Sequence, residues 1–129
     1  MQRTLVTLAA AIVLGAVTVA PASAVLPKKN GVYVGEIKSS PFAMRVSLGV
    51  TKTGTAARVT YHCGTGRAPT TIFGMKIDPK GYFKFESDPA TGQAWKLAGH
   101  FVTPATALVS LNSISCGGSK GSTTLKLKT

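Results

Sequence analysis

Apolar and polar residues alternate strictly over the segment 42–63. Every second residue from Phe42 to Val50 is apolar, and the residues between them are small or charged. After a turn-like run at 52–54 the alternation resumes and continues to Cys63. A period of two is typical of a strand with one face in a core. We therefore expect a long β-hairpin whose second strand ends at a cysteine.

The same alternation recurs along the rest of the chain. It predicts six further strands, around 33–37, 73–77, 83–85, 95–101, 107–116 and 125–127. Segments rich in Gly, Pro and Ser separate them, at 64–69, 78–81, 88–92 and 117–122. No segment after residue 24 shows helical periodicity. About eight antiparallel strands joined by short turns predict an all-β fold in mostly up-and-down order, as a flattened barrel or a two-sheet sandwich.

Two strands carry finer predictions about side-chain direction. On the fourth strand we expect Phe73, Met75 and Ile77 to face inward. On the seventh strand the apolar pattern changes phase near Asn112, which predicts a β-bulge that keeps Ile114 and Cys116 on the inward face.

The aromatic residues are predicted to form the core. Tyr82 alone shares the outer face with lysines, whereas the following are expected inward: Phe42, Tyr61, Phe73, Phe83, Phe85, Trp95 and Phe101. So many rings fill a small barrel and leave no wide ligand cavity. They also argue against specific nucleic-acid binding by stacking, which needs aromatics beside cations on one surface.

Residues 1–24 have the pattern of a secretory signal peptide. Arg3 precedes a continuous apolar run, Pro21 breaks it, and Ala22-Ser23-Ala24 is a small-residue cleavage site. The alternative is a membrane anchor, but the run is shorter than the ~20 residues of a spanning helix. We expect one secreted β-domain at 25–129, either extracellular or associated with the cell envelope, with no transmembrane segment after cleavage.

The two cysteines predict a disulfide, Cys63–Cys116, because a secreted chain meets an oxidising compartment. In an up-and-down order the third and seventh strands run the same way, so both cysteines lie at one end of the domain. In a round eight-stranded barrel these strands are opposite, beyond the ~7 Å Cα limit for a bridge. Either the barrel is flattened, which we favour, or a loop carries one cysteine across the mouth.

The charge is strongly positive. There are 15 lysines and arginines against 4 acids, a formal net charge of +11, which becomes +10 when Arg3 is removed with the signal. The basic residues are spread over the predicted outer positions, which suits salt-sensitive attraction to a polyanion; the alternative is that they serve solubility alone. The glycine-rich loops at the disulfide end carry Arg67 and Lys120, with Lys38 nearby, and are the predicted binding surface.

Little in the sequence points to catalysis. Asp78 and Asp88 precede prolines in turns, and a glycosidase pair of carboxylates is not indicated. His62 and His100 are expected at opposite ends of the domain, so no metal site is predicted. We expect a non-enzymatic protein without cofactors.

One resemblance rests on short motifs over the whole mature chain: Gly31-x-Tyr33-x-Gly35, Cys63, Gly81-Tyr82-Phe83, Gly99-His100-Phe101 and Cys116. This layout resembles small secreted β-domains of high-GC Gram-positive bacteria. The resemblance implies no activity and no site residues. The expected function is a monomeric, non-catalytic binding domain for anionic envelope or extracellular polymers. The alternative is an inhibitor-like or toxin-like protein that recognises an acidic surface of another protein through the disulfide-end loops.

Overall fold

The computed structural model describes residues 24–64, 69–87 and 95–128. It forms eight strands, in chain order: β1 (Val32–Ile37), β2 (Met44–Val50), β3 (Ala56–Cys63), β4 (Thr70–Lys76), β5 (Tyr82–Glu86), β6 (Trp95–Thr103), β7 (Thr106–Ser113) and β8 (Ser119–Leu127). One 3-10 helix, η2 (Ile114–Cys116), joins β7 to β8. The all-β prediction is therefore confirmed.

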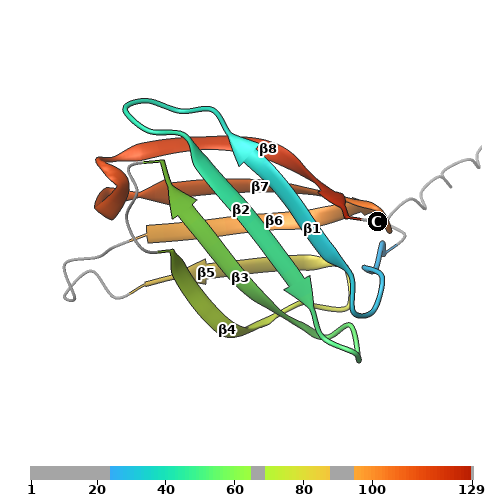
Figure 1. Cartoon of the computed structure of the whole chain (residues 1–129). Helices are drawn as coiled ribbons and strands as arrows, with labels where there is room; N and C mark the ends of the chain where they lie inside the picture. Colours follow the sequence, from blue (N-terminus) through green and yellow to red (C-terminus); the bar gives the residue numbers. More distant parts are fainter. Residues whose placement is uncertain (1–23, 65–68, 88–94, 129) are drawn as a thin grey trace, which may run out of the picture.

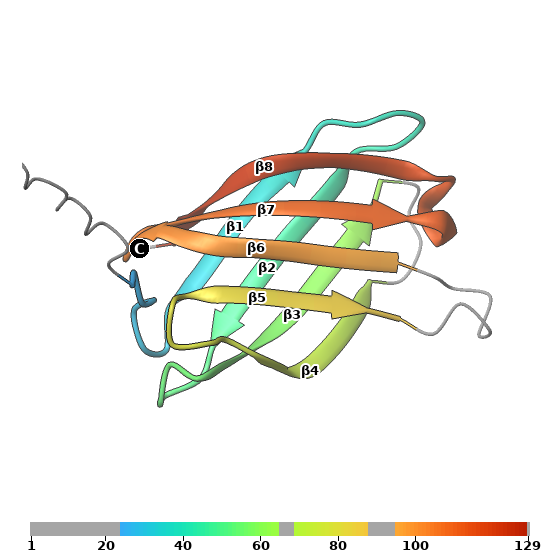
Figure 2. The same cartoon turned by 180° about the vertical axis from the view of Figure 1, so that it is seen from behind.

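All eight strands belong to one antiparallel sheet, in the order β4-β3-β2-β1-β8-β7-β6-β5. Consecutive strands pair from β1 to β4 and from β5 to β8, and the two halves of the sheet are joined by the pairing of β1 with β8. The sheet curls so that β1–β4 lie in front of β5–β8 (Figures 1 and 2). The result is a flattened, nearly closed barrel whose two edge strands are β4 and β5. The predicted up-and-down order is confirmed.

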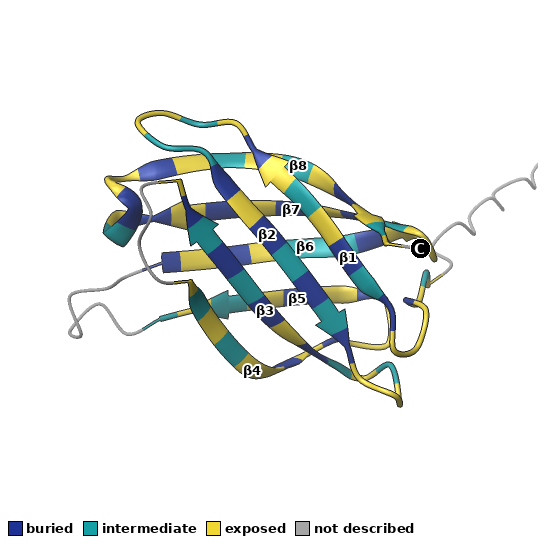
Figure 3. Cartoon of the chain, in the orientation of Figure 1, coloured by how far each residue is buried: buried dark blue, intermediate teal, exposed yellow. Residues whose placement is uncertain are grey.

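Alternate residues of each strand face the interior, as the buried and exposed positions show in Figure 3. Two aromatic clusters occupy the core. At one end Phe101 contacts both Tyr33 and Phe83, with ring centroids 5.1 and 5.5 Å apart. At the other end Trp95 contacts Tyr61 and Phe85 at 4.9 and 4.7 Å.

The prediction for Phe73 is wrong, because the side chain is 76% exposed. β4 pairs with β3 both before and after residues 73 and 74, through Ile72 and through Met75, and the register of the pairing shifts between these two residues. A bulge at Phe73 and Gly74 causes this shift, and Gly74 has a φ of +74°, a conformation that glycine adopts readily. The bulge returns Met75 to the core but turns Phe73 outward.

The predictions for the end of β7 are also corrected. In place of a bulge, the chain enters η2 after Ser113, and the helical turn leaves Ile114 65% exposed while burying Cys116. The predicted loop at 117–122 is shorter than expected. β8 already begins at Ser119, which pairs with Ser113.

The Cys63–Cys116 disulfide is present, with Cα atoms 5.7 Å apart. Both cysteines lie at one end of the barrel, as strand parity predicts. β3 and β7 are nevertheless four places apart in the sheet order. Flattening brings the two halves of the sheet together, and η2 carries Cys116 towards the end of β3 (Figure 1). The flattening of the barrel and a connecting segment that carries one cysteine across its mouth thus both contribute to the bridge.

Candidate functional site

The outer face of β5–β8 carries an aromatic row. Tyr82 pairs with His100 across β5 and β6, and His100 pairs with Leu108 across β6 and β7. The Tyr82 and His100 rings stack, with centroids 4.7 Å apart and planes 18° from parallel. A stack covers only one face of each ring, and Tyr82 remains 52% exposed. An aromatic platform therefore lies open to solvent.

A row of short side chains runs beside this platform. Ala98, Ser110 and Ser122 are consecutive partners across β6, β7 and β8, and Lys84 of β5 begins the same row. Because these side chains are small, the surface is hollowed beside the Tyr82–His100 stack. The hydroxyls of the two serines lie on the floor of this hollow.

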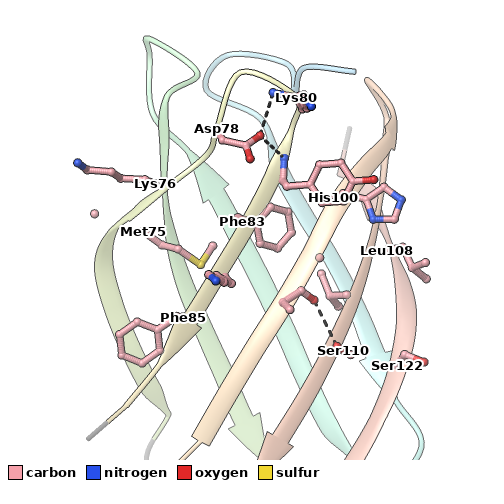
Figure 4. Close-up of a pocket in the computed structure, with 16 residues that line it drawn as sticks. Met75, Lys76, Asp78, Lys80, Phe83, Phe85, His100, Leu108, Ser110 and Ser122 are labelled. Carbon is pink, nitrogen blue, oxygen red and sulfur yellow. Dashed lines mark hydrogen bonds between the residues drawn. The ribbon is translucent and has the colours of Figure 1, made fainter. Parts of the chain in front are cut away.

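The hollow belongs to an open groove of about 1100 Å³, which we call the seam groove. It extends from the outer face of β5–β8 to the gap between β4 and β5, where Met75 and Phe85 lie (Figure 4). Its charged lining residues are Lys76, Asp78, Lys80 and Lys84. Aromatic, hydroxyl and cationic groups therefore converge on one surface.

The gap exists because β4 and β5 are not joined by a ladder in the described part of the sheet. The Gly81 carbonyl accepts a hydrogen bond from the Phe101 N–H, and the Ser87 N–H donates to the Trp95 carbonyl, so the backbone groups of the two residues that flank β5 are directed towards β6. Backbone groups alternate in direction along an antiparallel strand. The N–H and C=O of Lys84 and Glu86 therefore point away from β6, towards the gap.

A turn at residues 78–81 fixes the base of the platform. Asp78 Oδ1 accepts hydrogen bonds from the N–H groups of Lys80, at 2.8 Å, and Tyr82, at 3.0 Å. The Asp78 N–H in turn donates to the Tyr82 carbonyl at 2.9 Å. The carboxylate is thus engaged by the backbone, and Tyr82 is held at the start of its strand.

Most of the positive charge of the groove has no acidic partner. Within residues 24–64, 69–87 and 95–128, the one ion pair joins Lys96 to Glu86 at 3.2 Å, and both side chains are largely exposed. Lys76, Lys80 and Lys84 are exposed and lie outside that pair. Exposed cations without partners attract anions, with a strength that depends on salt.

A second open groove, of about 600 Å³, lies on the outer face of β1–β3. Glu36 pairs with Arg45, and Arg45 pairs with His62, in a row across these strands. Its lining thus places one carboxylate, Glu36, beside Arg45 and His62, and no Phe, Tyr or Trp ring lines it. This groove is a weaker candidate for an anion.

The residues predicted from sequence as a binding surface occupy the other end of the barrel. Lys120 is the second residue of β8, next to the disulfide end, and a Cβ added at Gly121 would lie 3.9 Å from the Cβ of Ser39. Gly121 and Ser39 are thus close in space, and Lys120 and Lys38 are the residues that precede them in the sequence. Arg67 lies outside the described residues. Within the described ranges neither Lys38 nor Lys120 takes part in an ion pair, and the binding role of this surface stays a prediction.

The histidines lie apart, as expected. His62 precedes Cys63 at the disulfide end, whereas His100 pairs with Tyr82 near the opposite end. Among the described residues no group of three or more His, Cys, Asp or Glu side chains could hold a metal ion.

The alternation along the chain predicts that Tyr82 faces outward, but it does not predict the stack of Tyr82 with His100. Both positions are outward by alternation on consecutive strands, which is the available signal. Their pairing depends on the register of β5 against β6, which the long connection between these strands left open. The gap beside β5 had no signal in the sequence.

The described residues contain no helix with the length and apolar composition needed to cross a membrane. No protein-family model matches the chain, and neither the curated proteins nor the solved structures contain a match to it.

Proposed function

We propose that the chain is a secreted, non-catalytic binding domain that associates with anionic polymers of the cell envelope or the extracellular space. The observation that carries this proposal is the seam groove, in which Lys76, Lys80 and Lys84 are exposed beside an aromatic platform. All lysines and arginines of the described residues are exposed, and only Lys96 is ion-paired there. A net charge of +11 adds long-range attraction for a polyanion.

The proposed location rests on two features. Residues 1–24 have the composition of a signal peptide, and the Cys63–Cys116 bridge suits an oxidising compartment. Anionic polymers are abundant outside cells, so the basic surface would meet its ligand there.

Binding to polyphosphate across a salt series tests the proposal. If the three groove lysines contact the polymer, the logarithm of the affinity should fall linearly with the logarithm of the salt concentration, with a slope of about −2 or steeper. Polyphosphate is the probe because it has charge but no rings. Absence of binding at low salt would rule the proposal out.

One observation favours a second candidate function, recognition of another protein through the disulfide end. Ile114 is 65% exposed on η2, which Cys116 ties to β3. A rigid exposed aliphatic side chain suits the centre of a protein interface, as an inhibitor-like or toxin-like protein would need. A partner whose binding resists salt and is lost in Ile114→Asp would support this alternative.

A further inference from the structure

We infer that the seam groove takes an acidic polysaccharide, with one sugar ring stacked on Tyr82 and the carboxylates or sulfates of the polymer near Lys80 and Lys84. This inference rests on the proposed function and names the class of polymer. It is motivated by the combination of an open aromatic face, unpaired cations and hydroxyl groups in one groove.

The Tyr82 ring provides the sugar contact. A pyranose presents an apolar face of C–H groups, which packs well on a rigid aromatic surface. His100 covers one side of the Tyr82 ring at 4.7 Å, and the Asp78 turn holds the Tyr82 backbone. The platform is therefore already in place before a ligand arrives, so little side-chain entropy is lost on binding.

The floor of the groove suits the hydroxyl groups of a sugar. Ser110 and Ser122 lie beside the platform, and the Ser110 hydroxyl makes only a long hydrogen bond, 3.5 Å, to the Ala98 carbonyl (Figure 4). The Lys84 backbone N–H and C=O face the gap between β4 and β5. The serine hydroxyls and the Lys84 backbone groups thus supply hydrogen-bond donors and acceptors for sugar hydroxyls. A polymer without hydroxyl groups would contact only the lysines.

The size and number of the aromatic surfaces distinguish this ligand from single-stranded nucleic acid. Nucleic-acid surfaces place successive bases on successive aromatic side chains. The seam groove has one outward stack, Tyr82 on His100, and Phe73 does not line it. One platform with flanking hydroxyls fits one sugar unit of a longer chain.

The test compares three polyanions and three variants of the purified protein at one low salt concentration. The probes are polygalacturonate, an acidic polysaccharide, polyphosphate, which has no ring, and oligo-thymidylate, which carries nucleic-acid bases. Tyr82→Ala should weaken polygalacturonate binding about tenfold, as expected for loss of one stacking contact, and leave polyphosphate binding unchanged within about twofold. Tyr82→Phe should restore polygalacturonate binding because the ring is kept. Phe73→Ala, an exposed aromatic outside the groove, is the matched control and should bind both polymers normally.

Each other result is informative. Equal losses for both polymers in Tyr82→Ala, or no loss for either, would overturn the sugar contact while leaving polyanion binding intact. Failure of the unmodified protein to bind either polymer would overturn the proposed function itself. Tighter binding of oligo-thymidylate than of polygalacturonate, lost in Tyr82→Ala, would show that the platform serves nucleic-acid bases and would also overturn the inference.

Discussion

Cys63 at the end of β3 is bonded to Cys116 in η2, which follows β7, four places from β3 in the sheet order; the two Cα atoms are 5.7 Å apart. The bridge therefore fastens the two halves of the flattened barrel to each other at one end. Beneath it, the Tyr61 hydroxyl lies 2.7 Å from the buried Ser113 hydroxyl. The opposite end, which carries the Asp78 turn and Tyr82, has no such covalent tie within the described residues.

Removal of the disulfide should lower stability without abolishing ligand binding. The two cysteines are 53 residues apart, and a bridge closing a loop of that length contributes about 4 kcal/mol in the chain-entropy model. The Cys63→Ser/Cys116→Ser variant should therefore unfold at a markedly lower urea concentration. If it stays folded, its affinity for polyphosphate should be unchanged, since the seam groove lies away from the bridge. An unchanged urea midpoint would show that the bridge does not constrain the chain.

Two phenylalanines test the strand assignments. Phe83 is buried at 4% exposure, so Phe83→Ala should destabilise the protein by about 3–5 kcal/mol. Phe73 is 76% exposed, so Phe73→Ala should change stability by no more than about 0.5 kcal/mol. Chemical denaturation of the two variants gives both values. A large loss in Phe73→Ala would mean that the bulge in β4 is absent and the side chain faces inward.

The alternation of residues predicted most of this fold. It placed the inward faces of β1, β2, β3, β5 and β6 correctly, because the alternation of more and less buried residues continues through the apolar run of each of these strands. It failed at Phe73 and Ile114, where a bulge or a helical turn shifts the phase. Such a shift depends on backbone conformation at a glycine or at a strand end, and a period-two pattern contains no information about it.

The candidate site was predictable only in part. Outward alternation identified Tyr82 and the lysines of β4 and β5, since each such residue faces solvent regardless of register. The groove itself arises from the missing ladder between β4 and β5 and from the pairing of Tyr82 with His100. One is the absence of a ladder between two consecutive strands and the other is the register of a strand pair, and neither follows from the local pattern of apolar and polar residues.

Tyr33 should make stability sensitive to alkaline pH. Burial raises the pKa of Tyr33 above its ordinary value of 10.0, although the hydrogen bond from the Lys28 backbone N–H opposes this shift. The unfolded chain loses this proton at lower pH than the folded protein does. The contribution of Tyr33 to the free energy of unfolding should therefore be constant below pH 10 and should fall as the pH rises above 10.

The Tyr33→Phe variant isolates this effect. It loses the hydrogen bonds to Lys28 and Pro104, so it should be less stable at neutral pH. Its stability should nevertheless decline less steeply than that of the unmodified protein between about pH 9 and pH 11. Urea denaturation across that range measures both slopes. Parallel slopes would show that Tyr33 does not titrate differently in the folded and unfolded states.

The central claim is that the seam groove is the main anion site. It is tested most directly by removing the same number of positive charges from the groove and from another part of the surface. Lys76→Gln/Lys80→Gln/Lys84→Gln removes three exposed charges from the groove, and Lys28→Gln/Lys29→Gln/Lys52→Gln removes three exposed charges outside its lining. A third variant, Lys38→Gln/Lys120→Gln, tests the surface predicted at the disulfide end.

The measurement is the affinity of each variant for polyphosphate at one low salt concentration, together with its salt slope. We expect the groove variant to lose about tenfold or more in affinity and to show a shallower slope, while the other two variants lose about threefold or less. Equal losses in both triple variants would contradict the account, because they would mean that the whole basic surface attracts the polymer and that the groove has no special part in binding.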